Sequence, residues 1–177
     1  YYSVVNNQLR YAGTVLFRGD KIVGVVPLSD DVFFQMLRDK KSVQKSVSLP
    51  AADVMLGSMK TERKVKFTDS FRKVQIDVML TGRVEEIPAR LKMVSPREWQ
   101  EFEERLERTI EENLKKVIDR TQSLSVDPFG LGMYTIGWLK RPFTREQWNQ
   151  RWSEADAEVH VSLNLENTGM INSHLPR

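Results

Sequence analysis

The sequence contains no cysteine, which excludes a disulfide framework, a thiolate metal site and a cysteine nucleophile. It has two histidines, His160 and His174, too few for a multi-histidine metal centre unless carboxylates supply the other ligands. No apolar run reaches the ~18 residues needed to cross a bilayer, and no signal peptide opens the chain. Because the first residue is Tyr1 rather than Met, we expect a fragment of a longer product, with any targeting signal upstream.

The length of 177 residues fits one domain, 1–177, large enough to bury a hydrophobic core. The net charge of +3 is too small to demand nucleic acid, and we expect no nucleic-acid partner. Basic residues nevertheless gather in one stretch: Lys60, Arg63, Lys64, Lys66, Arg72 and Lys73. Such a patch could contact phosphates or an anionic membrane surface. We favour a solvated hairpin face whose charge prevents edge-to-edge aggregation.

The first hundred residues are mainly of β-strand character. Residues 12–18 and 21–27 are apolar and β-branched, and Gly19-Asp20 between them fits a two-residue hairpin turn. Their nearly continuous apolar character predicts strands that are covered on both faces.

A helix is predicted next, over residues 30–40. Ser29 fits its N-cap, and Asp30 and Asp31 fall in the first turn, where the helix dipole favours negative charge.

Three strands follow in the predicted order. They cover residues 43–49, 53–67 and 74–87, with turn residues at 68–70. Gly82 is expected to mark a bulge in the last of them.

The strongest local pattern predicts a helix over residues 96–121. Ser95 and Glu98 form a capping box, with Pro96 at the first helical position. An apolar stripe at helical spacing comprises Trp99, Phe102, Leu106, Ile110, Leu114, Val117 and Ile118. Ion pairs at i,i+4 are expected for Glu104/Arg108, Glu111/Lys115 and Glu112/Lys116. Because strict heptads are not sustained, we expect this helix to pack across a sheet rather than form a coiled coil.

Residues 129–139 are predicted to form another helix, which Asp127-Pro128 can start. Three glycines in it, Gly130, Gly132 and Gly137, lower the helix propensity. We expect them to allow the close approach of another backbone.

The last elements are a short helix and a strand. Thr144 and Gln147 form a second capping box, and Trp148 and Trp152 follow one turn apart. Residues 157–166 alternate between apolar and polar side chains, which predicts a half-buried strand with one wet face.

This element order, β-β-α-β-β-β-α-α-α-β, predicts an α+β domain. We expect a largely antiparallel β-sheet with a long helix and shorter helices packed on one face.

No pattern of catalytic residues emerges. Gly130-Leu131-Gly132 lacks the strand and the charged partner of a nucleotide loop, and no G-x-S-x-G elbow is present. His160 is expected to face solvent. The carboxylate pairs Glu85-Glu86, Glu103-Glu104 and Glu111-Glu112 are expected on solvated surfaces. Trp148 and Trp152 could stack a sugar or a base, although core packing is the commoner role. We therefore predict no enzyme activity and no catalytic, cofactor-binding or metal-binding residues, and the ligand-binding residues are unknown.

The order of several motifs resembles the spore germination Ger(x)C family over about residues 9–171. Residues 127–132, Asp-Pro-Phe-Gly-Leu-Gly, then the Trp-containing helix and a final strand ending at Thr168-Gly169, are similar to the C-terminal region of that family. Residues 13–17, Gly-Thr-Val-Leu-Phe, and 21–24, Lys-Ile-Val-Gly, resemble its opening segment. The sequence departs from the family pattern at Pro128 and at Val25-Val26.

The resemblance implies a non-enzymatic subunit of a nutrient germinant receptor in an endospore-forming bacterium, here represented by its C-terminal domain. It implies a lipoprotein that an upstream lipid anchor holds at the extracytoplasmic face of the spore inner membrane. It also implies the germinant receptor A and B membrane subunits as partners, and protein–protein contact as the mode of action. No cofactor is implied. Asp127, Phe129, Gly130 and Gly132 are interpreted as architectural residues.

Two other functions stay open. The first is a secreted or extracytoplasmic small-ligand-binding domain that uses the aromatic region 129–152 as a pocket wall. The second is a basic nucleic-acid-binding module that uses residues 60–73.

Overall fold

The computed structural model describes residues 1–49, 54–86, 95–136, 139 and 142–166. Its elements are, in order, β1 (Tyr2–Val5), β2 (Gln8–Tyr11), β3 (Gly13–Arg18), β4 (Lys21–Pro27), α1 (Leu28–Arg38), β5 (Lys41–Leu49), β6 (Val54–Thr68), the 3-10 turn η2 (Asp69–Phe71), β7 (Lys73–Glu86), α2 (Pro96–Ser123), the 3-10 turn η3 (Leu131–Thr135), α3 (Arg145–Glu154) and β8 (Asp156–Glu166).

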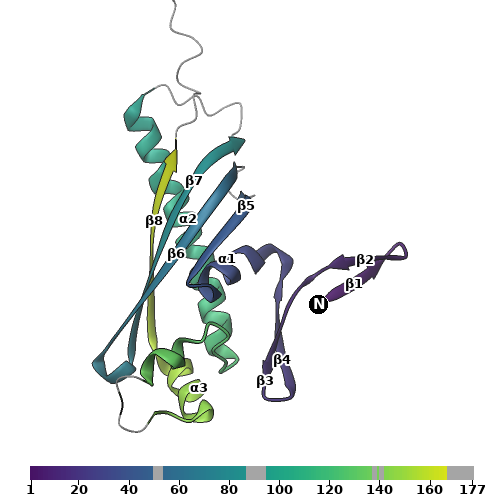
Figure 1. Cartoon of the computed structure of the whole chain (residues 1–177), viewed down its shortest axis with the longest axis vertical. Coiled ribbons are helices and arrows are strands. Elements are labelled where there is room, and N and C mark those ends of the chain that lie inside the picture. Colours follow the sequence, from purple (N-terminus) through teal and green to yellow (C-terminus); the bar gives the residue numbers. More distant parts are fainter. Residues whose placement is uncertain (50–53, 87–94, 137–138, 140–141, 167–177) are drawn as a thin grey trace, which may run out of the picture.

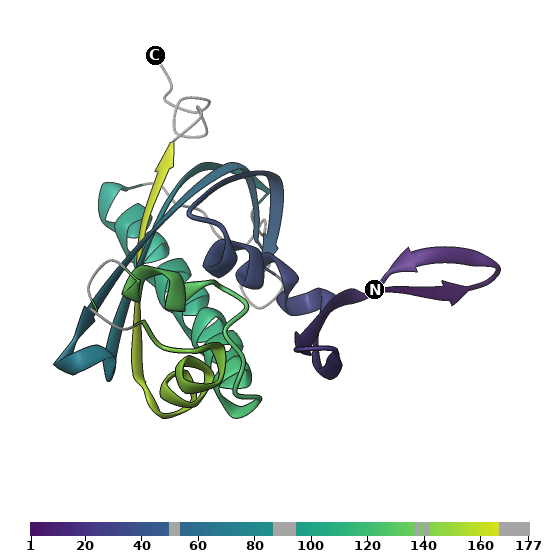
Figure 2. The same ribbon diagram turned by 60° about the horizontal axis from the view of Figure 1, so that its bottom comes forward.

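The body of the molecule is a four-stranded sheet with the order β5-β6-β7-β8. The pairs β5–β6 and β6–β7 are antiparallel, whereas β7 and β8 are parallel because α2 carries the chain back along the sheet before β8 begins. Figure 2 shows the sheet arching over α1 and α2. The α+β prediction, with a largely antiparallel sheet and a long helix on it, is confirmed.

The core lies between this sheet and the apolar stripe of α2. The capping box predicted at Ser95 and Glu98 is present, with the Ser95 amide donating to the Glu98 carboxylate at 2.9 Å. The stripe is buried as predicted at Phe102, Leu106, Ile110, Leu114, Val117 and Ile118. The buried Val74, Ile76, Val78 and Leu80 of β7 belong to the same core cluster. Each fully buried side chain of this size contributes about 1.5–3 kcal/mol, so this interface dominates the stability of the fold.

The hairpin β1–β2 extends away from the body (Figure 1), whereas β3–β4 lies beside it, with Arg120 of α2 donating to the Val25 carbonyl at 2.9 Å. The hairpin β3–β4 forms at the predicted turn, but the prediction that its strands are covered on both faces is wrong. Phe17 and Ile22 are 57% and 65% exposed, because the hairpin forms its own two-stranded sheet instead of joining the main one. The hairpin β1–β2 was not predicted from the sequence.

Ser29 is not the N-cap of the first helix. That position belongs to Pro27, at which the extended β4 ends, and no side chain caps it. The helix therefore begins at Leu28, directly where the strand ends. Asp30 and Asp31 do lie in its first turn, as expected.

The bulge expected at Gly82 is found on the neighbouring strand. Ser58 and Met59 of β6 stand together opposite Gly82, where the β6–β7 register shifts, and Ser58 has a φ of 51°. A Cβ atom at Gly82 would lie 2.2 Å from the Met59 sulfur. Glycine is therefore needed at this position because the bulge directs Met59 onto its backbone.

The ion pair predicted between Glu111 and Lys115 does not form. The Lys115 ammonium instead lies 2.7 Å from the Asp119 carboxylate. The Glu111 carboxylate turns to the sheet, where it accepts a hydrogen bond from the Val161 amide at 2.8 Å.

Glu111 belongs to a regular series of contacts between α2 and β8, which we call the glutamate ladder. Glu107 accepts from the Leu163 amide at 2.7 Å, and Glu103 accepts from the Leu165 amide at 3.0 Å. The geometry matches because four residues of helix rise ~6.0 Å and two residues of strand ~6.6 Å. The ladder thus satisfies three outward amides of an edge strand and fixes the position of α2 along it.

Replacing Glu107 with alanine should leave the Leu163 amide without its acceptor. We expect the free energy of unfolding to fall by about 1.5–3 kcal/mol, as for hydrogen bonds to charged groups. Urea denaturation measures the change. Glu112→Ala is the matched control because it removes the same side chain from an exposed position of the same helix, and it should change stability by less than about 0.5 kcal/mol. Equal losses in the two variants would contradict the role of the ladder.

Candidate functional site

Within the described ranges, no three or more histidine, cysteine or acidic residues are placed to hold a metal ion. His160 faces solvent as predicted, with its Nε2 3.9 Å from a Glu158 carboxylate oxygen and a side chain that is 57% exposed. None of the helices in the described part of the chain is long and apolar enough to cross a membrane.

The carboxylate pairs noted in the sequence do not come together either. Glu85 lies 3.4 Å from the Arg83 guanidinium at the surface. The prediction that Glu103-Glu104 and Glu111-Glu112 lie on solvated surfaces is wrong for Glu103 and Glu111, since both belong to the glutamate ladder. The signal was present in the sequence, because glutamates at 103, 107 and 111 repeat every four residues along one helix face.

Asp127 organises the segment between α2 and α3. One carboxylate oxygen accepts from the Phe129 amide at 3.1 Å, and the other accepts from the Gly132 amide at 2.8 Å and from the Trp148 indole at 2.7 Å. Asp127 thus has the architectural role inferred from the family resemblance. The predicted helix over 129–139 is wrong in extent: the described part contains only the short turn η3, which follows a left-handed Gly130 at φ 69°. Positions 137–138 and 140–141 lie outside the described residues.

Gly132 permits a close approach, although to a side chain rather than to the expected backbone. A Cβ atom there would lie 2.7 Å from the Trp148 ring. Trp148 and Trp152 are buried, as expected for core packing, and the predicted capping box at Thr144 and Gln147 is present.

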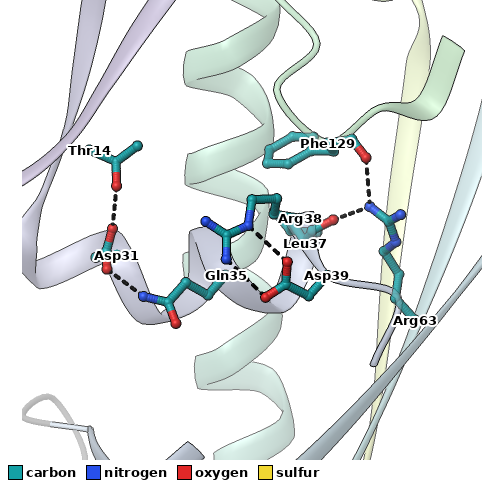
Figure 3. Close-up of polar contacts among 8 residues, drawn as sticks. All are labelled: Thr14, Asp31, Gln35, Leu37, Arg38, Asp39, Arg63 and Phe129. Atoms are coloured by element: carbon teal, nitrogen blue, oxygen red, sulfur yellow. Dashed lines mark hydrogen bonds and ion pairs between the residues drawn. The ribbon is translucent and has the colours of Figure 1, made fainter. Parts of the chain in front are cut away.

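Arg63 differs from the rest of the basic stretch to which it belongs. Lys60, Lys64, Lys66, Arg72 and Lys73 are exposed, but Arg63 is only 3% exposed, so the prediction of a solvated face is wrong at this position. Figure 3 shows its guanidinium donating to the carbonyl oxygens of Leu37 and Phe129. The Phe129 contact measures 3.3 Å.

This contact joins three parts of the fold. Leu37 lies in the last turn of α1, where the carbonyls lack helical partners and the helix dipole is negative, so a cation is favoured there. Phe129 belongs to the segment organised by Asp127, and Arg63 itself comes from the sheet. The planar guanidinium can donate in several directions at once, which suits this bridging position.

Asp31 forms the corresponding link to the N-terminal arm, by which we mean residues 1–27 with the hairpins β1–β2 and β3–β4. Asp31 is 5% exposed and accepts from Thr14 at 2.7 Å, from Tyr11 at 2.9 Å and from Gln35 at 2.7 Å (Figure 3 shows Thr14 and Gln35). The sequence identified Asp31 only as a first-turn acid and gave no signal for this contact.

Two surface features could bind a partner. A cavity of about 560 Å³ lies between β3 and residues of 126–136 and 142–149, with Phe17, Phe143, Trp148 and Arg145 among its lining residues. The second feature is the arm, which exposes large apolar side chains. They are Tyr1, Tyr2, Val4, Val5, Leu9, Tyr11, Phe17 and Ile22. So many large apolar residues within one short segment indicate an interaction surface.

The family model described as Spore germination B3/GerAC like, C-terminal, matches residues 12–169. The chain therefore belongs to this family of spore germination proteins, and the resemblance seen in the sequence is confirmed. Among solved structures, the crystal structure of the GerBC protein has a TM-score of 0.73 at 18% identity. The match covers 94% of this chain and 55% of that one, so the chain spans about half the length of its structural relative. No curated protein sequence matches the chain.

The pKa of Asp127 gives a pH-dependent prediction. Burial raises the pKa of this carboxyl above its usual 3.8, although its contacts with Gly132, Trp148 and Phe129 oppose the shift. The folded state therefore binds a proton more readily than the unfolded state, so this group adds stability as pH falls through the folded-state pKa towards 3.8. We expect Asp127→Asn to destabilise the fold by about 2 kcal/mol, because the NH2 group of its amide must face at least one N–H group, that of Phe129, from which the carboxylate accepts a hydrogen bond.

The stability difference between wild type and Asp127→Asn should also widen as pH is lowered from 7. Urea denaturation at several pH values measures it. Asp20→Asn, in the exposed β3–β4 turn, is the control and should show only a small loss at every pH. A difference for Asp127→Asn that stays constant or narrows as pH falls would contradict the assignment.

Proposed function

We propose that this chain is part of a non-enzymatic C subunit of a nutrient germinant receptor and acts by protein–protein contact at the spore inner membrane. The observation that carries the proposal is the family match over residues 12–169. The exposed apolar arm supports a contact function, because free surfaces of monomeric proteins seldom gather so many large apolar side chains.

The proposed partners are the A and B membrane subunits of the receptor. A lipid anchor upstream of this chain would hold the subunit at the extracytoplasmic face of the membrane. The arm is the surface that we assign to partner contact. Phe17 and Ile22 face each other across the tip of β3–β4 and offer two apolar side chains beside Arg18 and Lys21.

Co-purification of the full-length protein with its membrane subunits tests the proposal. The double variant Phe17→Ser/Ile22→Ser should retain the fold, since both side chains are exposed, yet reduce the recovered membrane subunits at least about tenfold, the scale of a hot-spot loss. His160→Ala, on the exposed polar face of β8, is the control and should co-purify as wild type does. A wild-type protein recovered without membrane subunits would overturn the proposal.

The cavity beside β3 supports a second candidate function, the binding of a small extracytoplasmic ligand. Its volume of about 560 Å³ falls in the range of small-molecule sites, and aromatic side chains with two arginines, Arg18 and Arg145, line it. A thermal-shift panel of amino acids, sugars and nucleosides separates the two candidates. We expect Trp148→Ala to melt at a lower temperature than wild type even without a compound. A compound that raises the melting temperature of wild type, but does not raise that of Trp148→Ala, would favour this function. A flat response across the panel would exclude it.

A further inference from the structure

The two edge strands of the main sheet, β8 and β5, differ in the hydrogen bonding of their outward backbone groups. On β8 the glutamate ladder accepts hydrogen bonds from the outward amides of Val161, Leu163 and Leu165. At the other edge lies β5, which is hydrogen-bonded on one side to β6 (Figure 1). Among the described residues, no backbone or side-chain hydrogen bond is made to the outer side of β5.

The register shows which groups of β5 face this open side. The Arg63 amide donates to the Lys40 carbonyl at 2.9 Å, so these directly opposed residues form a hydrogen-bonded pair. Hydrogen-bonded pairs occur at every second residue along antiparallel strands. The backbone N–H and C=O groups of Ser42 and Gln44 therefore also point towards β6. The N–H and C=O groups of Lys41 and Val43 therefore point outward, in the arrangement that an added strand requires.

Side chains on the inner face of the same edge also lack partners. In the part of the chain that the structure describes, buried atoms without a hydrogen bond include Ser42 Oγ, both polar atoms of the Gln44 amide and Thr61 Oγ1. Ser42 is directly opposite Thr61 in the register, and Gln44 follows two residues on, so these groups gather at one place. A buried polar group without a partner costs about 1–3 kcal/mol, and a neighbouring strand would bring side chains to within about 5 Å of Ser42 and Gln44.

The outer face of this edge is apolar and basic. Val43 is 73% exposed, the Lys41 side chain is 70% exposed, and the exposed Lys60 lies opposite Val43 in the register. Glu62, 3.6 Å from Lys41, is the acidic residue among them. A second copy of this chain would bring like charges together at the edge, which disfavours self-pairing. Acidic side chains of a partner would complement the positive charge of this edge.

We propose that β5 is a docking edge that accepts an extended acidic segment of a different polypeptide as a fifth strand of the sheet. Backbone pairing with Lys41 and Val43 holds the segment. Its outward side chains are acidic or apolar, and its inward side chains are polar and bond with Ser42 and Gln44. This mode of recognition takes its affinity from main-chain hydrogen bonds and its specificity from alternate side chains. The inference goes beyond the proposed function and concerns a surface distinct from the arm.

A designed peptide tests this inference on the chain as it stands. The probe is acetyl-Glu-Thr-Val-Asn-Val-Thr-Glu-amide with a fluorescent label, and fluorescence anisotropy measures its binding. We expect saturable binding that weakens as salt is added. A peptide with lysine in place of both glutamates, and one N-methylated at alternate amides on its pairing edge, should each bind at least tenfold more weakly.

Variants at Val43 distinguish peptide binding by backbone pairing with β5 from peptide binding elsewhere on the chain. Val43→Pro removes an outward N–H that β6 does not use, so the fold should survive while peptide binding falls at least tenfold. Val43→Thr keeps both the backbone and the β-branched shape and should bind within twofold of wild type. If the proline variant does not fold, Lys41→Glu supplies the test: it should weaken the acidic peptide and strengthen the lysine peptide.

Equal binding of the acidic peptide to wild type and to a folded Val43→Pro variant would overturn the proposal. So would the absence of saturable binding to the wild-type chain, or a Lys41→Glu variant that leaves the charge preference unchanged. Because the assay contains no membrane subunit, its outcome is independent of the co-purification experiment.

Discussion

The position of α2 along β8 is the constraint on which the arrangement of the other elements depends, and the glutamate ladder sets it. Glu103, Glu107 and Glu111 fix α2 along β8 through three charge-assisted hydrogen bonds. The same helix uses its apolar stripe to cover β7 and its neighbours. A single helix therefore covers the sheet with its apolar stripe and accepts hydrogen bonds from the outward amides of one edge strand. Because both sets of contacts are made by one rigid helix, the position of one set fixes the position of the other.

Smaller elements are attached to this body through buried polar groups. Arg63 connects the sheet to the end of α1 and to the segment after α2, whereas Asp31 connects α1 to the arm. Asp127 then fixes α3 through the Trp148 indole. A buried polar group is costly unless its hydrogen bonds are made, so each contact selects one arrangement of the elements it joins. The fold thereby holds the arm and the open edge in defined positions.

Local patterns predicted the elements well because the information lies within a few neighbouring residues. The capping boxes at Ser95 and Thr144, the stripe of α2 and the alternation of β8 were all confirmed. The contacts that fix the tertiary arrangement are of another kind. The distance in sequence between Arg63 and Phe129, or between Glu107 and Leu163, leaves no local signature, and a basic residue in a basic stretch gives no sign that it is buried. Hairpin β3–β4 shows the converse error: its apolar residues predicted burial on both faces, yet Phe17 and Ile22 face solvent because the hairpin does not join the main sheet.

The surfaces proposed for partner contact were hard to predict for the same reason. A strand edge can accept a partner only where no other element of the fold covers it. The residue pattern of β5 does not show whether another element covers that strand. The family match relates the chain to spore germination, and the structure adds two surfaces with different chemistry, the apolar arm and the basic edge at β5. Both are compatible with a subunit that acts through contact with other proteins.

The difference between the two sheet edges is the central structural claim, and amide hydrogen exchange of the isolated chain measures it directly. The Leu163 amide, held by Glu107, should exchange at least about 100-fold more slowly than the outward Val43 amide, relative to their unfolded rates. Equal protection of the two amides would show that the β5 edge is covered or that the ladder does not form, and either finding would contradict the account.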